Sequence, residues 1–168
     1  MAPKLSAIPA PFATADLCDA HGERCQACSL QFRSFGGQRA FAGKIRTLRC
    51  HADNALVRRA LETTATGQVL VVDGGGFLGA ALLGDQLATL GAANGWGGVI
   101  IHGAVRDSVA LATIDFGVKA LGTNPQRGAK LGVGEIDVQV TFGGVTFTPG
   151  QWLYSDEDGI VVSSDPLL

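Results

Sequence analysis

The chain has 168 residues, of which 46% are hydrophobic and 17% are charged. This length corresponds to one domain, and the high apolar content excludes an intrinsically disordered chain. The 13 basic and 15 acidic residues give a net charge of −2, which is too balanced for a surface that neutralises nucleic-acid phosphates. We therefore expect one α/β domain over residues 1–168 with no direct nucleic-acid ligand.

The N-terminal half begins with a short helix predicted at residues 14–20. Strands are expected at residues 31–35 and 40–50, on either side of a two-glycine turn. Asp53 is the expected cap of a second helix that runs to about residue 64, because its apolar residues recur at helical spacing.

Strands and helices then alternate along the chain. Residues 68–73, 99–102 and 118–121 are expected to form strands buried on both faces, as parallel strands are. Helical spacing of apolar residues predicts helices at 80–94 and 108–114. This alternation is typical of a parallel sheet.

The pattern changes from residue 137 onward to alternation with a period of two. Residues 137–142 and 145–148 are predicted to form a hairpin around two glycines, followed by antiparallel strands at 152–155 and 160–163. The residues themselves therefore predict a parallel layer and an antiparallel layer, with helices outside.

The sequence does not predict a membrane or secretory protein. No apolar stretch approaches the roughly 18 residues of a membrane span, and the N-terminus lacks the continuous apolar segment of a signal peptide. Four cysteines are too few for a disulfide scaffold at this length. We expect a cytoplasmic protein whose thiols are reduced.

Three motifs have mainly structural interpretations. Residues 74–79 read G-x-G-x-x-G, but the acidic residue that binds a cofactor ribose is missing downstream, so a tight turn or an anion cradle is favoured over a dinucleotide site. The pair Cys25-x-x-Cys28 lacks the second pair of ligands that a zinc site needs. Residues 156–159 are too short for a calcium loop and are expected to form a turn.

A fourth set of residues favours chemistry. Asp85 is separated by twenty residues from Arg106-Asp107, which follow the strand 99–102. If that strand neighbours 68–73 in a parallel sheet, these side chains emerge at its carboxyl edge, where ligands of such sheets bind. The carboxylates suit Mg²⁺, and the arginine suits a substrate carboxylate or a developing oxyanion. The alternative is an Arg106 salt bridge in a loop.

Five segments of the sequence resemble the family of the regulator of ribonuclease activity A, which includes the 4-hydroxy-4-methyl-2-oxoglutarate aldolases. They cover residues 70–76, 81–85, 94–98, 103–107 and 142–145, and the resemblance extends from residue 14 to residue 161, which is nearly the whole chain. The aldolases of this family carry the motif Gly-X3-Asp-X20-Arg-Asp, and this chain keeps its Asp85, Arg106 and Asp107. The motif's glycine is replaced by Ala81.

The resemblance implies a three-layer β/β/α swivelling domain with a parallel central sheet and an antiparallel second sheet. It also implies a homotrimer, sometimes paired into a hexamer, with the site at the subunit boundary. In one branch of the family, a divalent metal, Mg²⁺ or Mn²⁺, supports cleavage of 4-hydroxy-4-methyl-2-oxoglutarate or 4-carboxy-4-hydroxy-2-oxoadipate and decarboxylation of oxaloacetate. In the other branch, the protein binds and inhibits an endoribonuclease of the RNase E type without chemistry.

Roles for individual residues follow from the same resemblance. Asp107 would ligate the metal, and Asp85 would hold its waters. Arg106 would stabilise the oxyanion formed from a small 2-oxo acid substrate. The substrate site would comprise Gly84, Asp85, Gln86, Leu87 and Arg106. Retention of Asp107 favours the aldolase, although the chain ends at Leu168 without the C-terminal extension of longer aldolases. A metal-ordered water is the expected general base, and a structural role is favoured for His102. A quinone-methyltransferase role, also assigned to such chains, is given little weight.

Overall fold

The computed structural model describes residues 11–168 and consists of four α-helices, one short 3-10 helix and twelve strands in that part of the chain. The helices are α1 (Thr14–His21), η1 (Gly22–Arg24), α2 (Ala55–Glu62), α3 (Asp85–Ala93) and α4 (Ser108–Leu111). The strands are β1 (Gln26–Ala27), β2 (Arg33–Ser34), β3 (Phe41–Arg49), β4 (Val69–Asp73), β5 (Ala81–Leu83), β6 (Gly98–Val105), β7 (Gly117–Thr123), β8 (Glu135–Ile136), β9 (Val140–Phe142), β10 (Val145–Phe147), β11 (Trp152–Ser155) and β12 (Ile160–Ser163).

Four parallel strands form the centre of the molecule in the order β3-β4-β6-β7. Residues 69–72 of β4 and 98–101 of β6 are buried without interruption, because both faces of these strands are covered by other elements. The prediction of buried parallel strands is therefore confirmed.

The antiparallel strands continue the same sheet instead of forming a separate one. The first half of β3, residues 41–44, pairs with β11, whereas its second half, residues 45–49, pairs with β4. Because one long strand serves both sets of partners, ten strands belong to a single mixed sheet. The expectation of a separate antiparallel sheet holds only for the two-stranded pair β9-β10.

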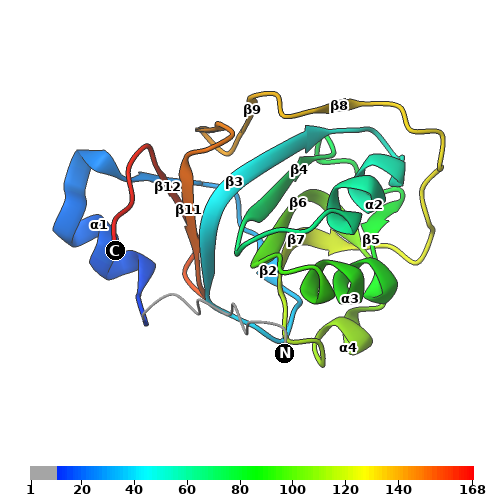
Figure 1. Cartoon of the computed structure of the whole chain (residues 1–168), viewed down its shortest axis with the longest axis horizontal. Helices are drawn as coiled ribbons and strands as arrows, with labels where there is room; N and C mark the ends of the chain where they lie inside the picture. The colour runs from blue at the N-terminus through cyan, green and yellow to red at the C-terminus, as the bar shows by residue number, and fades with distance from the viewer. Residues whose placement is uncertain (1–10) are drawn as a thin grey trace.

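Figure 1 shows the helices and strands arranged in three layers, and the two larger apolar clusters lie between these layers. The first cluster lies between the parallel strands and α2, α3 and α4, and the second lies between the other face of these strands and β9–β12. The layer arrangement predicted from the sequence, helices outside and strands in two layers, is present despite the continuous hydrogen bonding of the sheet.

The two strands expected around a glycine turn do not pair with each other. β2 pairs antiparallel with β7, at the opposite side of the parallel sheet from the β11 partner of β3. The segment between β2 and β3 packs directly against the backbone that precedes β7, since a Cβ at Gly36 would lie 2.0 Å from the carbonyl oxygen of Phe116. A glycine is required there for close approach.

The helix predicted at 80–94 begins later than expected. Residues 81–83 form β5, which pairs in parallel with β6, and α3 begins only at Asp85. All three β5 side chains are buried. These three apolar residues therefore belong to a strand beside β6 and not to the buried face of a helix. β6 is also longer than predicted and continues through Val105.

The C-terminal predictions are confirmed. β9 and β10 form a hairpin in which Phe142 pairs with Val145, and the intervening Gly143 and Gly144 both have left-handed backbone angles, with φ of 60° and 75°. β11 and β12 are antiparallel neighbours. No helix within residues 11–168 combines the length and apolar character that crossing a membrane requires.

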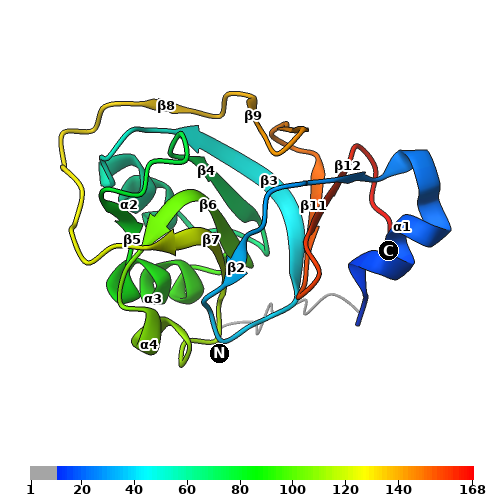
Figure 2. The same ribbon diagram turned by 180° about the vertical axis from the view of Figure 1, so that it is seen from behind.

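Asp53 fixes the long segment between β7 and β8, which passes α2 and β5 at the edge of the molecule in Figures 1 and 2. Its side chain is 3% exposed. Asn54, and not the expected Asp53, occupies the cap position of α2. The Asp53 carboxylate instead accepts the N–H of Ala55, the first residue of α2, at 3.0 Å, and those of Leu131, Gly132 and Val133 at 2.9–3.4 Å. Burial alone would raise the pKa of Asp53, but these four donors outweigh it and lower the pKa.

We expect Asp53→Ala to lower the free energy of unfolding by about 3 kcal/mol, because several buried N–H groups lose their only side-chain acceptor. Denaturant titration of the wild type and the variant measures this loss. Since the folded-state pKa lies below the ordinary carboxyl value of about 3.9, the contribution is present at neutral pH and disappears as the pH falls through that folded-state pKa. A difference between the two proteins that persists undiminished at pH 2 would contradict this account.

Candidate functional site

Two loops at the carboxyl edge of the sheet bring the predicted site residues together. β5 and β6 are parallel neighbours in which Leu83 pairs with Val105. Asp85 follows β5 after one residue, and Arg106 and Asp107 follow β6 directly. The sequence argument required β4 and β6 to be neighbours, which they are, but it is β5 that places Asp85 beside Asp107.

Asp107 is the centre of this arrangement. Its Oδ2 accepts the backbone N–H of Asp85 at 3.1 Å and lies 3.9 Å from Nε of Arg106. The residue has left-handed backbone angles, φ 58° and ψ 41°, and precedes the first residue of α4. The Arg106 N–H donates to the carbonyl oxygen of Leu83 at 2.9 Å. The backbone therefore holds both side chains at the junction of the two loops.

Gly84 has no room for a side chain. A Cβ at this position would lie 2.4 Å from Oδ2 of Asp107 and 3.2 Å from Cγ of Arg106. Gly84 is also the residue before α3, with an extended φ of −134°, so the requirement for glycine comes from close approach and not from a left-handed backbone. The absent side chain is what lets the Asp107 carboxylate reach the N–H of Asp85.

A polar pocket of about 310 Å³ opens at this point. The residues that the sequence placed in the site all line it: Gly84, Asp85, Gln86, Leu87, Arg106 and Asp107. Residues 85–87 form the first turn of α3, whose N–H groups have no partners inside the helix. The positive end of the helix and the arginine make this part of the pocket favourable for a carboxylate.

The sequence argument missed four further polar residues of the pocket. Asn54 directly precedes α2 and Arg58 belongs to it, whereas Arg127 and Lys130 come from the segment between β7 and β8. The available signal was the position of residues 124–130 after a parallel strand, since the loop after β7 reaches the same sheet edge as those after β5 and β6. With Arg106, the pocket contains four cationic side chains and two carboxylates.

The donor set fits a hard divalent cation. Asp107 and Asp85 supply carboxylates, and residues 11–168 contain no group of three or more His, Cys, Asp or Glu side chains that could hold a metal by themselves. Mg²⁺ in proteins typically has one or two carboxylate ligands and completes its shell with waters and ligand oxygens. A site of that kind needs no further protein ligand.

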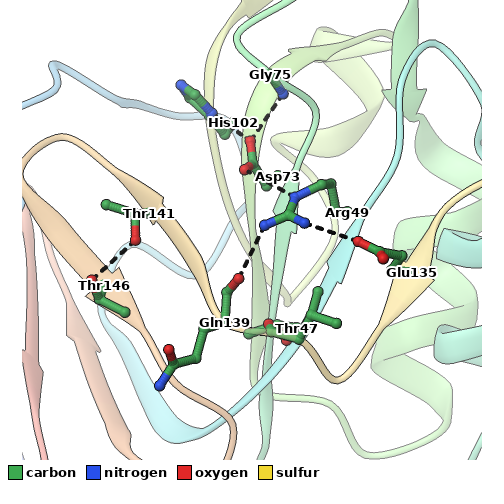
Figure 3. A network of polar contacts seen from close by, with 10 residues as sticks. Thr47, Arg49, Asp73, Gly75, His102, Glu135, Gln139, Thr141 and Thr146 are labelled. Atoms are coloured by element: carbon green, nitrogen blue, oxygen red, sulfur yellow. Dashed lines mark hydrogen bonds and ion pairs between the residues drawn. The ribbon is translucent and has the colours of Figure 1, made fainter.

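His102 belongs to a different network, drawn in Figure 3. Its Nδ1 lies 2.8 Å from Oδ1 of Asp73, which also accepts the N–H of Gly75. The ring stacks on Phe142 at 4.3 Å between centroids, on the face of the sheet away from α2 and α3. The hydrogen bond from His102 lowers the pKa of Asp73. His102 therefore does not line the pocket, in agreement with the structural role favoured for it.

Arg49 extends this network across the sheet edge. It donates to Glu135 at 2.9 Å and to the carbonyl oxygen of Gln139 at 3.1 Å, and it lies 4.0 Å from Asp73. Figure 3 shows these partners converging from β3, β4 and the segment around β8. The charged groups beside the shallow hollow at Arg49 and Asp73 are thus already paired with one another, and their effect is to fasten that segment to the sheet.

The other sequence motifs have structural roles. The glycine motif at 74–79 forms a tight turn, in which the N–H groups of Gly74 and Gly76 both donate to the carbonyl oxygen of His102. It leads into β5 instead of a helix, so its interpretation as an anion cradle at a helix start is wrong, and the strand-turn-helix context of a dinucleotide site is missing. Residues 156–159 form the turn between β11 and β12.

The cysteines are free thiols. The Cys25 thiol donates to the carbonyl oxygen of Leu17, whereas the Cys28 thiol lies 4.0 Å from the carbonyl oxygen of Phe142, so the two thiols face different neighbours. Burial raises the pKa of Cys50 to about 12, which makes it unreactive at neutral pH.

Comparisons with known proteins agree on the fold and cover nearly the whole chain. Residues 14–162 match the RraA-like family model, Aldolase/RraA. A protein of Aromatoleum aromaticum named "Putative 4-hydroxy-4-methyl-2-oxoglutarate aldolase" is 57% identical over 157 residues, which are 94% of this chain and 99% of the relative.

Two solved structures superpose closely. One from Geobacillus kaustophilus, described as an S-adenosylmethionine: 2-dimethylmenaquinone methyltransferase, has a TM-score of 0.91 and 49% identity, covering 93% of this chain and 97% of the other. One from Thermus thermophilus, described as the RNA-processing inhibitor RraA, has a TM-score of 0.90 and 47% identity, covering 94% and 95%. The names of these three relatives describe three different functions. The choice between the functions therefore rests on the residues of the site.

Proposed function

The chain belongs to the RraA-like family, Aldolase/RraA, and from this premise we propose that it is a carbon–carbon lyase dependent on Mg²⁺ or Mn²⁺. It cleaves 4-hydroxy-4-methyl-2-oxoglutarate or 4-carboxy-4-hydroxy-2-oxoadipate to pyruvate, and it decarboxylates oxaloacetate. The observation that carries this proposal is the Asp107 carboxylate, held by the N–H of Asp85 beside Arg106 in a polar pocket.

Asp107 would hold the metal directly, and Asp85 would hold waters around it. A divalent cation supplies Lewis-acid stabilisation of the negative oxygen that develops on the 2-oxo group. The substrate's own carboxylate faces the N–H groups of Gln86 and Leu87 at the start of α3, which fixes the orientation of the reacting bond.

Arg106 stabilises the charge that forms in the reaction. Breaking the C3–C4 bond after loss of the 4-hydroxyl proton leaves the bond's electron pair on the pyruvyl half, as an enolate. A guanidinium donates charge-assisted hydrogen bonds to that oxygen. Loss of CO₂ from oxaloacetate leaves the same enolate, so one set of residues serves both reactions. A proton added at C3 then gives pyruvate.

No histidine lines the pocket, and His102 lies on the other face of the sheet. We therefore assign the base for the 4-hydroxyl proton to a water held near the side chain of Asp85 or Arg106.

The site lies at a boundary between subunits of a homotrimer, or of a hexamer built from two trimers. Support comes from the segment that carries Arg127 and Lys130, which also exposes Leu131 and Val133 by 81% and 67%. Phe77 and Leu78 of the glycine turn are exposed as well. We assign these exposed apolar side chains to the surface that would meet a second copy of the chain.

We expect the purified protein to release pyruvate from oxaloacetate with Mg²⁺ or Mn²⁺ and to lose at least about 90% of this activity in EDTA, because the carboxylates alone cannot stabilise the enolate. A coupled pyruvate assay, corrected for decarboxylation by the free metal, measures the release. Activity that EDTA leaves intact would contradict the metal dependence.

The inhibitor function is the second candidate, because the Thermus thermophilus structure described as an RNA-processing inhibitor is 47% identical over 94% of this chain. Absence of pyruvate release above background would favour it. Retention of an RNase E-type endoribonuclease on the immobilised protein, with slower RNA cleavage, would then be the supporting result. A structure described as a methyltransferase is as similar to this chain, with 49% identity over 93% of it. The glycine motif of this chain leads into a strand, however, and so lacks the strand-turn-helix context of a nucleotide-cofactor site.

A further inference from the structure

The cations of the pocket exceed what the proposed chemistry uses. Arg106 lies 3.9 Å from Asp107, and Arg58 lies 4.0 Å from Glu62 in the next turn of α2. Arg127 and Lys130 form no ion pair within the described residues 11–168. Both nevertheless line the same 310 Å³ pocket as Asp85 and Asp107.

The charges of the pocket can be summed for a site that holds a divalent cation. A divalent cation balances the two carboxylates, and four positive side chains then remain in the pocket: Arg58, Arg106, Arg127 and Lys130. One substrate carboxylate faces Arg106 and the start of α3. Arg127 and Lys130, which have no acidic partner within residues 11–168, are left for the end of the substrate remote from the pyruvyl group, together with Arg58, which lies 4.0 Å from Glu62. Such a surplus favours a ligand with two remote carboxylates over a ligand with one.

The backbone of Arg127 is fastened to β5. It forms an isolated bridge with Ala81, whose N–H donates to the carbonyl oxygen of Gln126 at 2.7 Å. Asn124 secures the same turn, because its side chain accepts the N–H of Gln126 and donates to the carbonyl oxygen of Leu78. The segment is therefore fastened to β5 at the edge of the pocket, which limits where the guanidinium can reach.

We propose that Arg127, assisted by Arg58 from α2, recognises the carboxylates at the remote end of the substrate and makes the site selective for tricarboxylates over dicarboxylates. The assignment of the reactive end rests on the proposed lyase function. Recognition of remote carboxylates rests only on the pocket's own cations. The preferred substrate class is accordingly a 2-oxo acid that carries two carboxylates beyond the scissile bond, and 4-carboxy-4-hydroxy-2-oxoadipate is of this kind.

Titration calorimetry with tricarballylate and glutarate, in EDTA, tests the inference without catalysis. The wild type is expected to bind tricarballylate more tightly. In the Arg127→Gln variant, the ratio of the glutarate Kd to the tricarballylate Kd should fall about fivefold, as expected for the loss of one partly exposed charge pair. The Arg127→Lys variant should keep most of the wild-type preference. Arg59→Gln is the matched control, because Arg59 neighbours Arg58 on α2 but lies outside this pocket.

Cleavage kinetics give a second readout, with 4-carboxy-4-hydroxy-2-oxoadipate as the tricarboxylate and 4-hydroxy-4-methyl-2-oxoglutarate as the dicarboxylate. In Arg127→Gln, kcat/KM for the tricarboxylate should fall about fivefold relative to kcat/KM for the dicarboxylate. If the enzyme is active and the ratio of kcat/KM for the tricarboxylate to kcat/KM for the dicarboxylate is the same in wild type and Arg127→Gln, the inference is overturned. The proposed lyase function is then unaffected. An inactive wild type that still shows an Arg127-dependent preference for tricarballylate would overturn the lyase alone. Equal binding of tricarballylate and glutarate to the wild type would overturn the inference in either case.

Discussion

The Asp107→Asn variant is expected to keep its fold and to lose metal-dependent pyruvate release by at least about 100-fold. Asparagine tolerates the left-handed backbone of residue 107, where φ is 58°, and its side-chain oxygen can still accept the N–H of Asp85. The change therefore removes one negative charge and little else. Loss of a charged metal ligand removes several kcal/mol of transition-state stabilisation.

Initial rates with saturating Mn²⁺, together with thermal unfolding of each variant, measure the two halves of this prediction. Asp115→Asn is the matched control, because Asp115 is an exposed carboxylate beyond α4 that does not line the pocket. Its rate should equal that of the wild type. An Asp107→Asn enzyme with wild-type rates would remove Asp107 from the metal site and with it the central support of the proposed function.

The positions of Asp85 and Asp107 could be predicted because their spacing spans one strand of a parallel sheet. That argument needed only the direction of the strands, since parallel neighbours end at the same edge. It assigned residues 81–83 to a helix, however, because three consecutive apolar residues before a helix extend its periodicity. The short β5 strand is stabilised by its pairing with β6, which no local pattern reveals.

The remaining errors concern contacts between distant segments. The sequence contains no signal that β3 changes partners halfway, so the antiparallel strands were expected in a separate sheet. Arg58, Arg127 and Lys130 were missed for the same reason. Their elements are ordinary by themselves, and they meet at the pocket because Asp53 fastens the loop after β7 to the start of α2.

Gly84→Ala tests whether the geometry of Asp107, as well as its charge, supports catalysis. Alanine can adopt the extended backbone of residue 84, so little backbone strain is expected. Its Cβ would nevertheless lie 2.4 Å from Oδ2 of Asp107. The clash is with the end of a flexible side chain, and the carboxylate can move away at low cost to the fold. Such a movement breaks its hydrogen bond with the Asp85 N–H.

We therefore expect Gly84→Ala to unfold at nearly the wild-type temperature and to lose about 100-fold in kcat/KM for oxaloacetate, the effect of misplacing a reacting group by about 1 Å. Gly122→Ala on β7 is the control, because a Cβ there has no neighbour within 4 Å. Comparing the two variants separates a general cost of replacing glycine from displacement of Asp107. If Gly84→Ala retained full activity, the close contact between residue 84 and Asp107 would have no part in catalysis. If it unfolded instead, the contact would be a packing requirement of the β5–α3 junction.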